Sequence, residues 1–383
     1  MKGWRVAAAG MDMVRFTTSA GRNALLVLVV AGCGIGDHSK VAQVRAVDGC
    51  ESRAGWSRWA SGQQRIAAVS AEGQLGGWAG LTVVSDRVYV FDPSRPGVWV
   101  LNRNLAETRW LGRGGAGPGE LGTAPAFMYG PRVRWIDARG DTLVVYDGQR
   151  ASLFNARTGA FVAYRGIGGL SESGAVVRRL QMTSDAMLFD TGDYEAPDGA
   201  MTIRRRRVVE DTLWRVSLPP PPRRPGGGIV VVPNQAVPLW AAEGGCVVAS
   251  DGAGARLIRV STRTGAGDTL PLPSQVGNAR SGEDPGSFGG RPLPAPTLAA
   301  RIRALVLDPD GYAWIRPVAP ARDPAAPVIV LVVSVATGEA RWDTVPAFPA
   351  TFEAPGSYFG VRLGADGAPQ VVRVDTDTAP SSP

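Results

Sequence analysis

The sequence predicts an all-β fold, a β-propeller of six blades with four antiparallel strands in each blade. Short apolar runs recur along the chain and are separated by Asp-Gly, Thr-Gly or Pro-Gly turns, which is typical of consecutive antiparallel strands. Past residue 33 no segment keeps a helical period over three turns, and the best helix candidate, residues 298–307, is short. Each repeated group of a few short strands is too small to bury both of its faces, so the groups must stack, as in a propeller or a solenoid.

The first unit is expected over residues 86–121, with strands at 86–92, 98–102 and 107–111. The same order of strands and turns returns in further units at 141–168, 182–217, 245–265, 310–338 and 357–374. A lone strand at residues 64–69 precedes the first unit, and we expect it to complete the last blade and close the ring. Two stretches rich in Pro and Gly, at 219–228 and 281–296, predict loops inserted between units.

The N-terminus predicts a lipoprotein signal peptide. Arg15 and Arg22 precede a short apolar run, and residues 30–33 (VAGC) resemble the bacterial lipobox, in which Cys33 is acylated and becomes the new N-terminus. The apolar run is too short to span a bilayer. We therefore expect a signal peptide at 1–32, a polar tether at 33–58, the propeller at 59–378 and a disordered tail at 379–383. Gly34, rather than Asp, after the acylated cysteine favours the outer membrane if the source is Gram-negative.

Residues 86–121 resemble one blade of the NHL-like six-bladed β-propellers. Val88-Tyr89-Val90-Phe91-Asp92 and Val98-Trp99-Val100-Leu101-Asn102 are similar to the two strands of that family's pattern. The segment 111–121 (LGRGGAGPGEL) is similar to its closing turn, through Gly112, Gly114, Gly117, Pro118, Gly119 and Glu120. The resemblance implies a propeller over roughly residues 60–378, and exported lipoproteins with such propellers are common in bacteria.

The glycines of the same segment also fit the spacing G-x-G-x-x-G of dinucleotide-binding loops. That site needs a helix directly after the glycines, because the helix N-terminus meets the pyrophosphate. Pro118 and Gly119 follow instead, and no Walker-type motif exists because no lysine occurs after Lys40. The sequence therefore argues against nucleotide binding, and we interpret these glycines as turn residues.

Most catalytic centres are excluded by residue type. The only histidine, His38, lies in the tether, so the propeller lacks the imidazole of Ser–His–Asp, Cys–His and His–metal sites. Carboxylates recur near strand ends, at Asp92, Asp147, Asp190, Asp251 and Asp308. They either cap turns or, if gathered at the central channel, bind Ca²⁺ as in gluconolactonase-type propellers. We expect no cofactor, with Ca²⁺ as the alternative.

Two further groups of residues, a pair of cysteines and a run of arginines, each allow two interpretations. Cys50 and Cys246 belong to an exported protein, so they either pair in a disulfide or remain two thiols. The basic run of Arg204, Arg205, Arg206 and Arg207 is either a solvated strand face or an anionic-ligand patch. Removal of residues 1–32 lowers the net charge from +7 to about +4, which together with export argues against a nucleic-acid partner.

The chain has eleven tryptophans. We expect Trp99, Trp110, Trp135, Trp314 and Trp342 to pack between blades, and Trp56, Trp59 and Trp78 to be partly exposed. The sequence thus predicts a lipid-anchored propeller of the cell envelope with a binding or scaffolding role and a protein, peptide or carbohydrate ligand. The alternative is a Ca²⁺-dependent hydrolase or lactonase that uses carboxylates at the central channel.

Overall fold

The chain divides into two units, Met1–Gln43 and Val44–Pro383, and all described residues belong to the second. The computed structural model describes residues 46–53, 59, 63–70, 80–91, 97–106, 108–115, 117–121, 135–147, 150–165, 179–184, 186–192, 200–207, 210–217, 238–252, 256–277, 287–288, 291–292, 301–318, 326–354, 356–364 and 367–377.

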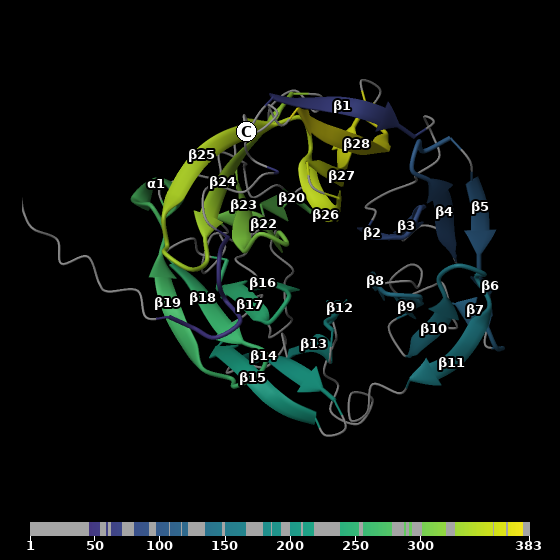
Figure 1. Ribbon diagram of the computed structural model, residues 1–383, viewed down its shortest axis with the longest axis horizontal. Helices are drawn as coiled ribbons and strands as arrows, with labels where there is room; N and C mark the ends of the chain where they lie inside the picture. Colours follow the sequence, from purple (N-terminus) through teal and green to yellow (C-terminus); the bar gives the residue numbers. More distant parts are fainter. Residues whose placement is uncertain are drawn as a thin grey trace, which may run out of the picture. The chain divides into compact units, whose positions relative to one another are not determined.

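Six four-stranded antiparallel sheets form the blades of a β-propeller, which confirms the predicted fold class (Figure 1). Blade 1 contains β2 (Gly80–Val84), β3 (Arg87–Phe91), β4 (Val98–Asn102) and β5 (Thr108–Leu111). Blade 2 contains β8 (Trp135–Arg139), β9 (Thr142–Tyr146), β10 (Ala151–Asn155) and β11 (Phe161–Arg165). Blade 3 contains β12 (Leu180–Met182), β13 (Met187–Gly192), β14 (Ala200–Arg206) and β15 (Glu210–Ser217).

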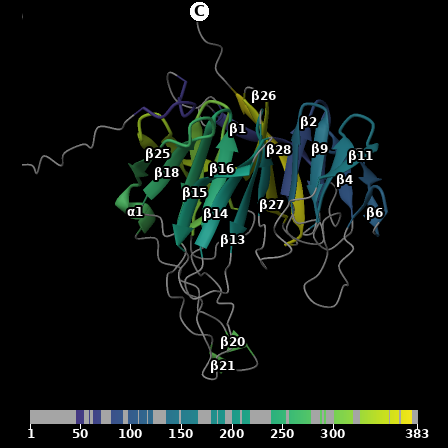
Figure 2. The same ribbon diagram turned by 90° about the horizontal axis from the view of Figure 1, so that it is seen from below.

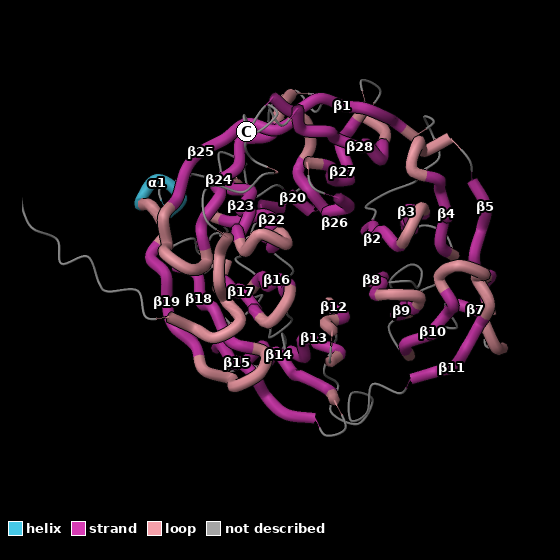
Figure 3. Tube along the Cα trace, viewed as in Figure 1, coloured by secondary structure: helices cyan, strands magenta, loops and turns pink. Residues whose placement is uncertain are grey.

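Blade 4 contains β16 (Leu239–Glu243), β17 (Cys246–Ser250), β18 (Arg256–Ser261) and β19 (Gly267–Pro271). Blade 5 contains β22 (Ile302–Leu307), β23 (Tyr312–Pro317), β24 (Val328–Ser334) and β25 (Ala340–Val345). Blade 6 contains β26 (Phe348–Ala354), β27 (Ser357–Leu363), β28 (Pro369–Asp377) and β1 (Gln63–Val69). The first strand of each blade along the chain is innermost, and the last strand lies at the rim (Figure 3). The sequence units therefore begin at the second strand of a blade, except for the unit at 182–217.

The ring closes by pairing the two ends of the propeller sequence. β1 is the outermost strand of blade 6 and pairs antiparallel with β28, from Gln63 opposite Asp377 to Val69 opposite Val372. The side chains of β1 alternate between exposed and partly buried, as expected for a strand with one solvated face. The expected closing strand at residues 64–69 is therefore confirmed.

Buried apolar side chains lie between neighbouring blades. One cluster joins blades 4 and 5 through residues such as Val248 and Leu331, and another joins blades 1 and 2 through Tyr89 and Phe154. The middle strands β9 and β17 are nearly or wholly buried because each is covered by a blade on both sides. Blade-to-blade packing therefore supplies the hydrophobic core.

Two kinds of connection lie at opposite ends of the blades. Tight turns join the first strand to the second and the third to the fourth, at one face of the ring. The long connections from an outer strand to the next inner strand start from the other face, as the position of β20 (Ser287–Phe288) and β21 (Arg291–Pro292) below the blades shows (Figure 2). We call these the turn face and the loop face.

One sequence expectation, the positions of three tryptophans, is wrong. Residues 302–307 of the weak helix candidate form the inner strand β22, which pairs with β23. The only helix among the described residues is the short α1 (Ser274–Gly277). Trp59 is buried, whereas Trp110 and Trp342, on the outer strands β5 and β25, are 45% and 40% exposed. Trp56 and Trp78 lie outside the described residues.

The turn face owes its shape to a repeated Thr-Gly turn. Asn155 Oδ1 accepts hydrogen bonds from the amides of Arg157 and Thr158, and Ser261 Oγ accepts the equivalent pair in blade 4. Gly159 and Gly265 follow with positive φ angles of 77° and 73°, where glycine is strongly preferred. The short polar side chain and the glycine together fix a compact turn at the same place in blades 2 and 4.

Candidate functional site

The inner strands of the blades surround the propeller axis (Figure 1), and polar side chains of several of them interact with one another. Thr82 lies on β2, Asp137 on β8 and Gln181 on β12. Arg179 directly precedes β12, at the start of blade 3. These strands belong to three consecutive blades, so residues distant in sequence meet at the axis. We treat this group, the axial cluster, as the candidate site.

Asp137 is the acidic member of the axial cluster. One carboxylate oxygen accepts a hydrogen bond from the amide of Met182, and the other lies 3.5 Å from Thr82 Oγ1. Burial raises the pKa of Asp137 to about 6, against the opposing effects of the backbone hydrogen bonds and of the Arg179 charge. The side chain still keeps some accessible surface. Asp137 is therefore a carboxyl group that exchanges its proton near neutral pH.

Arg179 is the basic member of the axial cluster. Its Nη1 donates to the carbonyl of Trp240 and, at 3.4 Å, to that of Leu305, so the side chain links blade 3 to blades 4 and 5. The guanidinium carbon lies 4.9 Å from the ring centre of Trp135 and 5.4 Å from that of Trp240. Burial lowers the pKa of Arg179 to about 10, and the charges of Asp190 and Asp137 oppose this shift. The cation is thus held between two indole rings, a favourable geometry.

Gln181 completes the axial cluster through two hydrogen bonds to one residue. Its Oε1 accepts from the amide of Ala242 at 2.9 Å, and its Nε2 donates to the Ala242 carbonyl. The cluster therefore extends from the inner strand of blade 1 to that of blade 5.

Several hydrogen-bond donors in the axial cluster and in the two indole rings beside it lack an acceptor among the described residues. The indole nitrogens of Trp135 and Trp240 and Nε of Arg179 are buried and have no hydrogen-bond partner among the described residues. An unpaired buried donor costs free energy, so a group that supplies an acceptor is favoured there. The chemistry of the site suits a polar ligand that carries acceptor oxygens.

The structure separates the carboxylates that the sequence singled out. Asp147 accepts a hydrogen bond from the amide of Arg150, and Asp308 accepts from the amides of Asp310 and Tyr312, so both cap turns. Asp190 accepts from the amide of Arg179. Asp251 follows β17, and Asp92 lies outside the described residues. Among the described residues, no three His, Cys, Asp or Glu side chains are close enough to hold a metal ion. No contact in this part of the chain favours the Ca²⁺-dependent enzyme.

The glycine-rich segment after β5 packs against blade 2. Glu120 accepts hydrogen bonds from the amide of Gly117 at 2.7 Å and from Arg113 Nε at 2.8 Å. Arg150 of blade 2 donates to the Glu120 carbonyl at 2.9 Å, and Tyr164 donates to the Gly117 carbonyl. Gly112 and Gly119 have positive φ angles of 77° and 75°. Gly114 pairs with Leu121 in the small sheet of β6 (Arg113–Gly114) and β7 (Glu120–Leu121), and Pro118 lies in the turn between them.

The arginine run lies on β14 and ends just after it. Arg204 pairs with Glu210 at 2.6 Å, and Arg205 pairs with Asp211 through both carboxylate oxygens. Arg205 and Arg207 also donate to the carbonyl of Thr262 in the next blade. Arg206 is the last residue of β14, and its backbone lies opposite that of Glu210 on β15. The guanidinium groups of Arg204 and Arg205 thus hold the sheet and the contact between blades 3 and 4.

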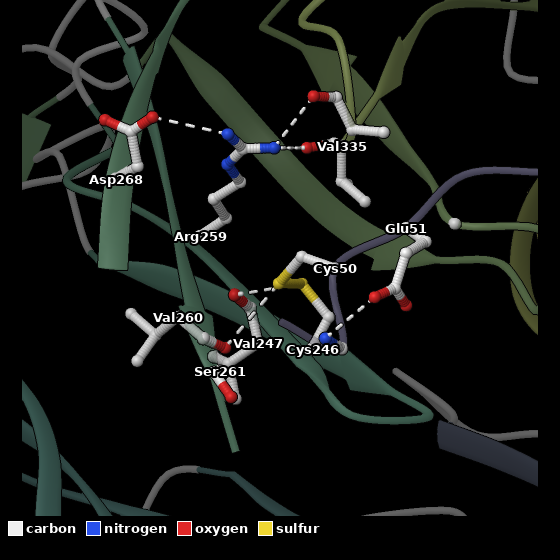
Figure 4. Close-up of a disulfide and its surroundings, with 12 residues drawn as sticks. Cys50, Glu51, Cys246, Val247, Arg259, Val260, Ser261, Asp268 and Val335 are labelled. Atoms are coloured by element: carbon white, nitrogen blue, oxygen red, sulfur yellow. Dashed lines mark hydrogen bonds and ion pairs between the residues drawn. A yellow bond between two sulfur atoms is a disulfide. The ribbon is translucent and has the colours of Figure 1, made fainter. Parts of the chain in front are cut away.

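Cys50 and Cys246 form a disulfide, with Cα atoms 4.8 Å apart (Figure 4). It joins the segment before β1 to the first residue of β17 in blade 4. Cys33 lies outside the described residues. In the described part of the chain, no helix has the length and hydropathy needed to cross a bilayer.

One surface pocket, of about 340 Å³, lies between the turns of blades 1 and 2. Its walls come from residues 84–87 and from Ala156 and Arg157. Arg157 pairs with Asp141 at 2.8 Å, and Arg87 donates to the Arg157 carbonyl. The charged groups of this pocket serve contacts within the protein, so it is a weaker candidate than the axial cluster.

The sequence analysis missed the axial cluster. Its signal was a charged or amide side chain inside a strand-like run, as in Ile136-Asp137-Ala138 and Leu180-Gln181-Met182. Such residues rarely lie in the interior of a sheet without a partner. Their partners come from other blades, so the sequence could not identify them.

Comparison with known proteins supports the fold alone. No family model matches the sequence, and no curated protein matches it. A solved member of the DUF4221 family from Bacteroides vulgatus is 10% identical, with a TM-score of 0.51 over 83% of this chain and 97% of that one. A Bacteroides fragilis protein thought to be exported is 10% identical, with a TM-score of 0.46 over 82% and 96%.

A regucalcin from Agrobacterium tumefaciens, a calcium-binding protein, is 13% identical, with a TM-score of 0.43 over 82% of this chain and 97% of that one. Identities this low carry no information on ligand or activity. The chain is a six-bladed propeller similar in fold to the DUF4221 protein, and its resemblance to the NHL family stays a prediction.

Proposed function

We propose that this protein is a lipid-anchored, NHL-like propeller of the bacterial cell envelope that binds a ligand at its axis. The axial cluster is the observation that carries the binding role. A carboxyl group that titrates near pH 6, a buried guanidinium and two indole rings meet there, and buried donors lack partners among the described residues. Perturbed ionisable groups of this kind concentrate at functional sites.

The anchor rests on the signal sequence and on residues 30–33 (VAGC). An acylated Cys33 would hold the protein at a membrane, in the outer membrane if the source is Gram-negative. The mature domain carries no histidine, which argues for binding or scaffolding rather than for imidazole-based catalysis. The expected ligand is a protein, a peptide or a carbohydrate.

The direction of approach follows from the two faces. The described segment before β1, residues 46–53, contacts the turn face at blades 4 and 5 and so occupies part of that face. The long connections between blades start from the opposite, loop face, and such connections commonly carry binding residues. We propose that the ligand approaches the axis from the loop face.

The test combines membrane fractionation with capture of bound material. The wild-type protein should be acylated and sediment with membranes, and the Cys33→Ala variant should be soluble and unlabelled by a fatty-acid analogue. The purified mature propeller, immobilised, should retain components of solubilised envelopes. An immobilised Arg179→Gln variant should retain at least tenfold less of these components than the wild-type propeller.

The matched control is Arg256→Gln, because Arg256 is an exposed arginine on β18, away from the axis. Equal capture by the Arg179 and Arg256 variants would overturn the axial site. Membrane sedimentation of the Cys33→Ala variant would overturn the anchor, and the two results are independent.

A further inference from the structure

The segment from Ala46 to Arg53 is fixed on the turn face across blades 4 and 5 by a disulfide, ion pairs and hydrogen bonds. The Cys50–Cys246 disulfide binds it covalently to blade 4, and Asp48 pairs with Arg263 at 2.8 Å. Arg53 pairs with Asp310 of blade 5 at 3.1 Å, and its amide donates to the Asp310 carbonyl. Val47 and Cys50 are buried in the core between these two blades. We call residues 46–53 the docked segment.

The propeller surface is shaped to receive the docked segment. A side chain at Gly49 would place its Cβ 2.6 Å from the carbonyl oxygen of Gly245, and one at Gly311 would overlap the carbonyl oxygen of Glu51. Ser52 accepts from the amide of Ala336 and from Ser334 Oγ, and it donates to the Gly311 carbonyl at 2.7 Å. Close backbone approach and satisfied hydrogen bonds indicate a built contact between the segment and the blades.

The position of β1 makes this contact important. β1 follows the docked segment in the chain and closes the ring, and Gln63 at its start lies opposite Asp377 at the end of β28. A pull on the start of β1, opposed at the end of β28, would therefore open the pair from one end, one hydrogen bond at a time. This geometry resists force least, because the bonds break in sequence rather than together.

We propose that the disulfide and the docked segment form a clasp that passes tension on the N-terminal tether into blade 4 and keeps it off the closing strand. With the disulfide intact, Cys50 and Cys246, which are 196 positions apart in sequence, close a covalent loop that includes β1. Tension that arrives at Cys50 continues at Cys246 and bypasses that loop. The clasp has a use in the cell if the tether is anchored, so this inference rests on the proposed membrane anchor.

Single-molecule pulling on the purified mature chain tests the clasp, with handles fused at both ends and Cys33→Ala to leave only two thiols. The oxidised protein should show no low-force step before global unfolding. The Cys50→Ser/Cys246→Ser variant should show an early low-force extension of roughly 80 Å as the chain from residue 44 to the end of β1 peels away. Its complete extension should also exceed that of the oxidised protein by about 690 Å, the length of extended chain across those 196 positions.

Two controls keep the test decisive. Ser52→Ala removes hydrogen bonds of the docked segment but leaves the covalent path, so it should behave as the oxidised wild type. Oxidised wild-type protein that is then reduced should behave as the serine variant, which covers the case that the variant folds poorly. An early step in the oxidised protein, or none after reduction, would overturn the clasp. Loss of membrane attachment in Cys33→Ala cells bears only on the anchor.

Discussion

At the scale of single residues, Asp137 is a partly buried carboxyl group with a raised pKa at the candidate site. Its carboxylate lies among inner strands, and the charged groups that act on it are Arg179, directly before β12, and Glu243, at the end of β16. Desolvation outweighs the hydrogen bond from Met182 and the attraction of Arg179, so the proton is held up to a pKa of about 6. A carboxyl group in this state can donate or accept a proton towards a ligand at the axis.

Asp137 should make the folded protein less stable as pH rises. The folded state holds the proton more tightly than the unfolded state, so the favourable contribution is complete below about pH 4 and is lost as pH rises through 6. The loss approaches about 3 kcal/mol at most, since the shift is about two pH units. Asp137→Asn should remove this part of the pH dependence. Urea unfolding at pH 4.5 and 7.5 measures it, and an unchanged difference between the two pH values would contradict the assignment.

At the scale of elements, arginine side chains join blade 3 to a turn of blade 4 and blade 4 to a turn of blade 5. Arg205 of blade 3 donates to the carbonyls of Thr262 and Arg263 in blade 4. Arg259 of blade 4, wholly buried, donates to the carbonyls of Val335 and Ala336 in blade 5 and pairs with Asp268 (Figure 4). A planar guanidinium reaches several acceptors at once, which an ammonium group cannot do in the same geometry. This accounts for some of the preference for arginine over lysine.

Arg259→Lys should destabilise the propeller by about 2–4 kcal/mol, because it leaves buried carbonyls unpaired beside a buried charge. The matched control is Arg256→Lys on the same strand, β18, where the side chain is exposed. That substitution should change the free energy of unfolding by less than about 0.5 kcal/mol. Denaturant unfolding of both variants measures the difference. Equal effects would mean that the contact with blade 5 is not structural.

At the scale of the whole molecule, β1 joins the start of the propeller sequence to its end. Ile66 packs with the cluster between blades 5 and 6, whereas Ala68 packs with the cluster that joins blade 6 to blade 1. The single strand therefore contributes to two of the interfaces that keep the ring closed. Removing it would expose the edge of β28 and part of both clusters to water.

Replacement of residues 63–69 by a Gly/Ser sequence of the same length should abolish cooperative unfolding of the propeller or lower its Tm strongly. The control carries the same kind of replacement at residues 71–79, after β1, and should retain cooperative unfolding. Circular dichroism during heating compares the two. A closing-strand variant with the wild-type Tm would show that the ring does not depend on β1.

Much of the fold could be predicted from local sequence. The strands β3, β4 and β5 match the runs 86–92, 98–102 and 107–111 closely, since their apolar residues are set off by clear turn residues. The inner strands are harder to recognise. β8 and β12 contain Asp137 and Gln181, which interrupt the apolar pattern because they are satisfied by other blades rather than by neighbours in sequence.

The sequence by itself determined the strand content, the repeat and the closing strand, because each depends on a local pattern of apolar and turn residues. The N-terminal processing also depends on a local pattern, and it stays a prediction. Only the tertiary structure decided that Cys50 pairs with Cys246, that Arg205 serves the sheet, and that Asp137 and Arg179 meet at the axis. These outcomes depend on distances between blades, and a closed ring brings together residues whose spacing along the chain carries no trace of that contact.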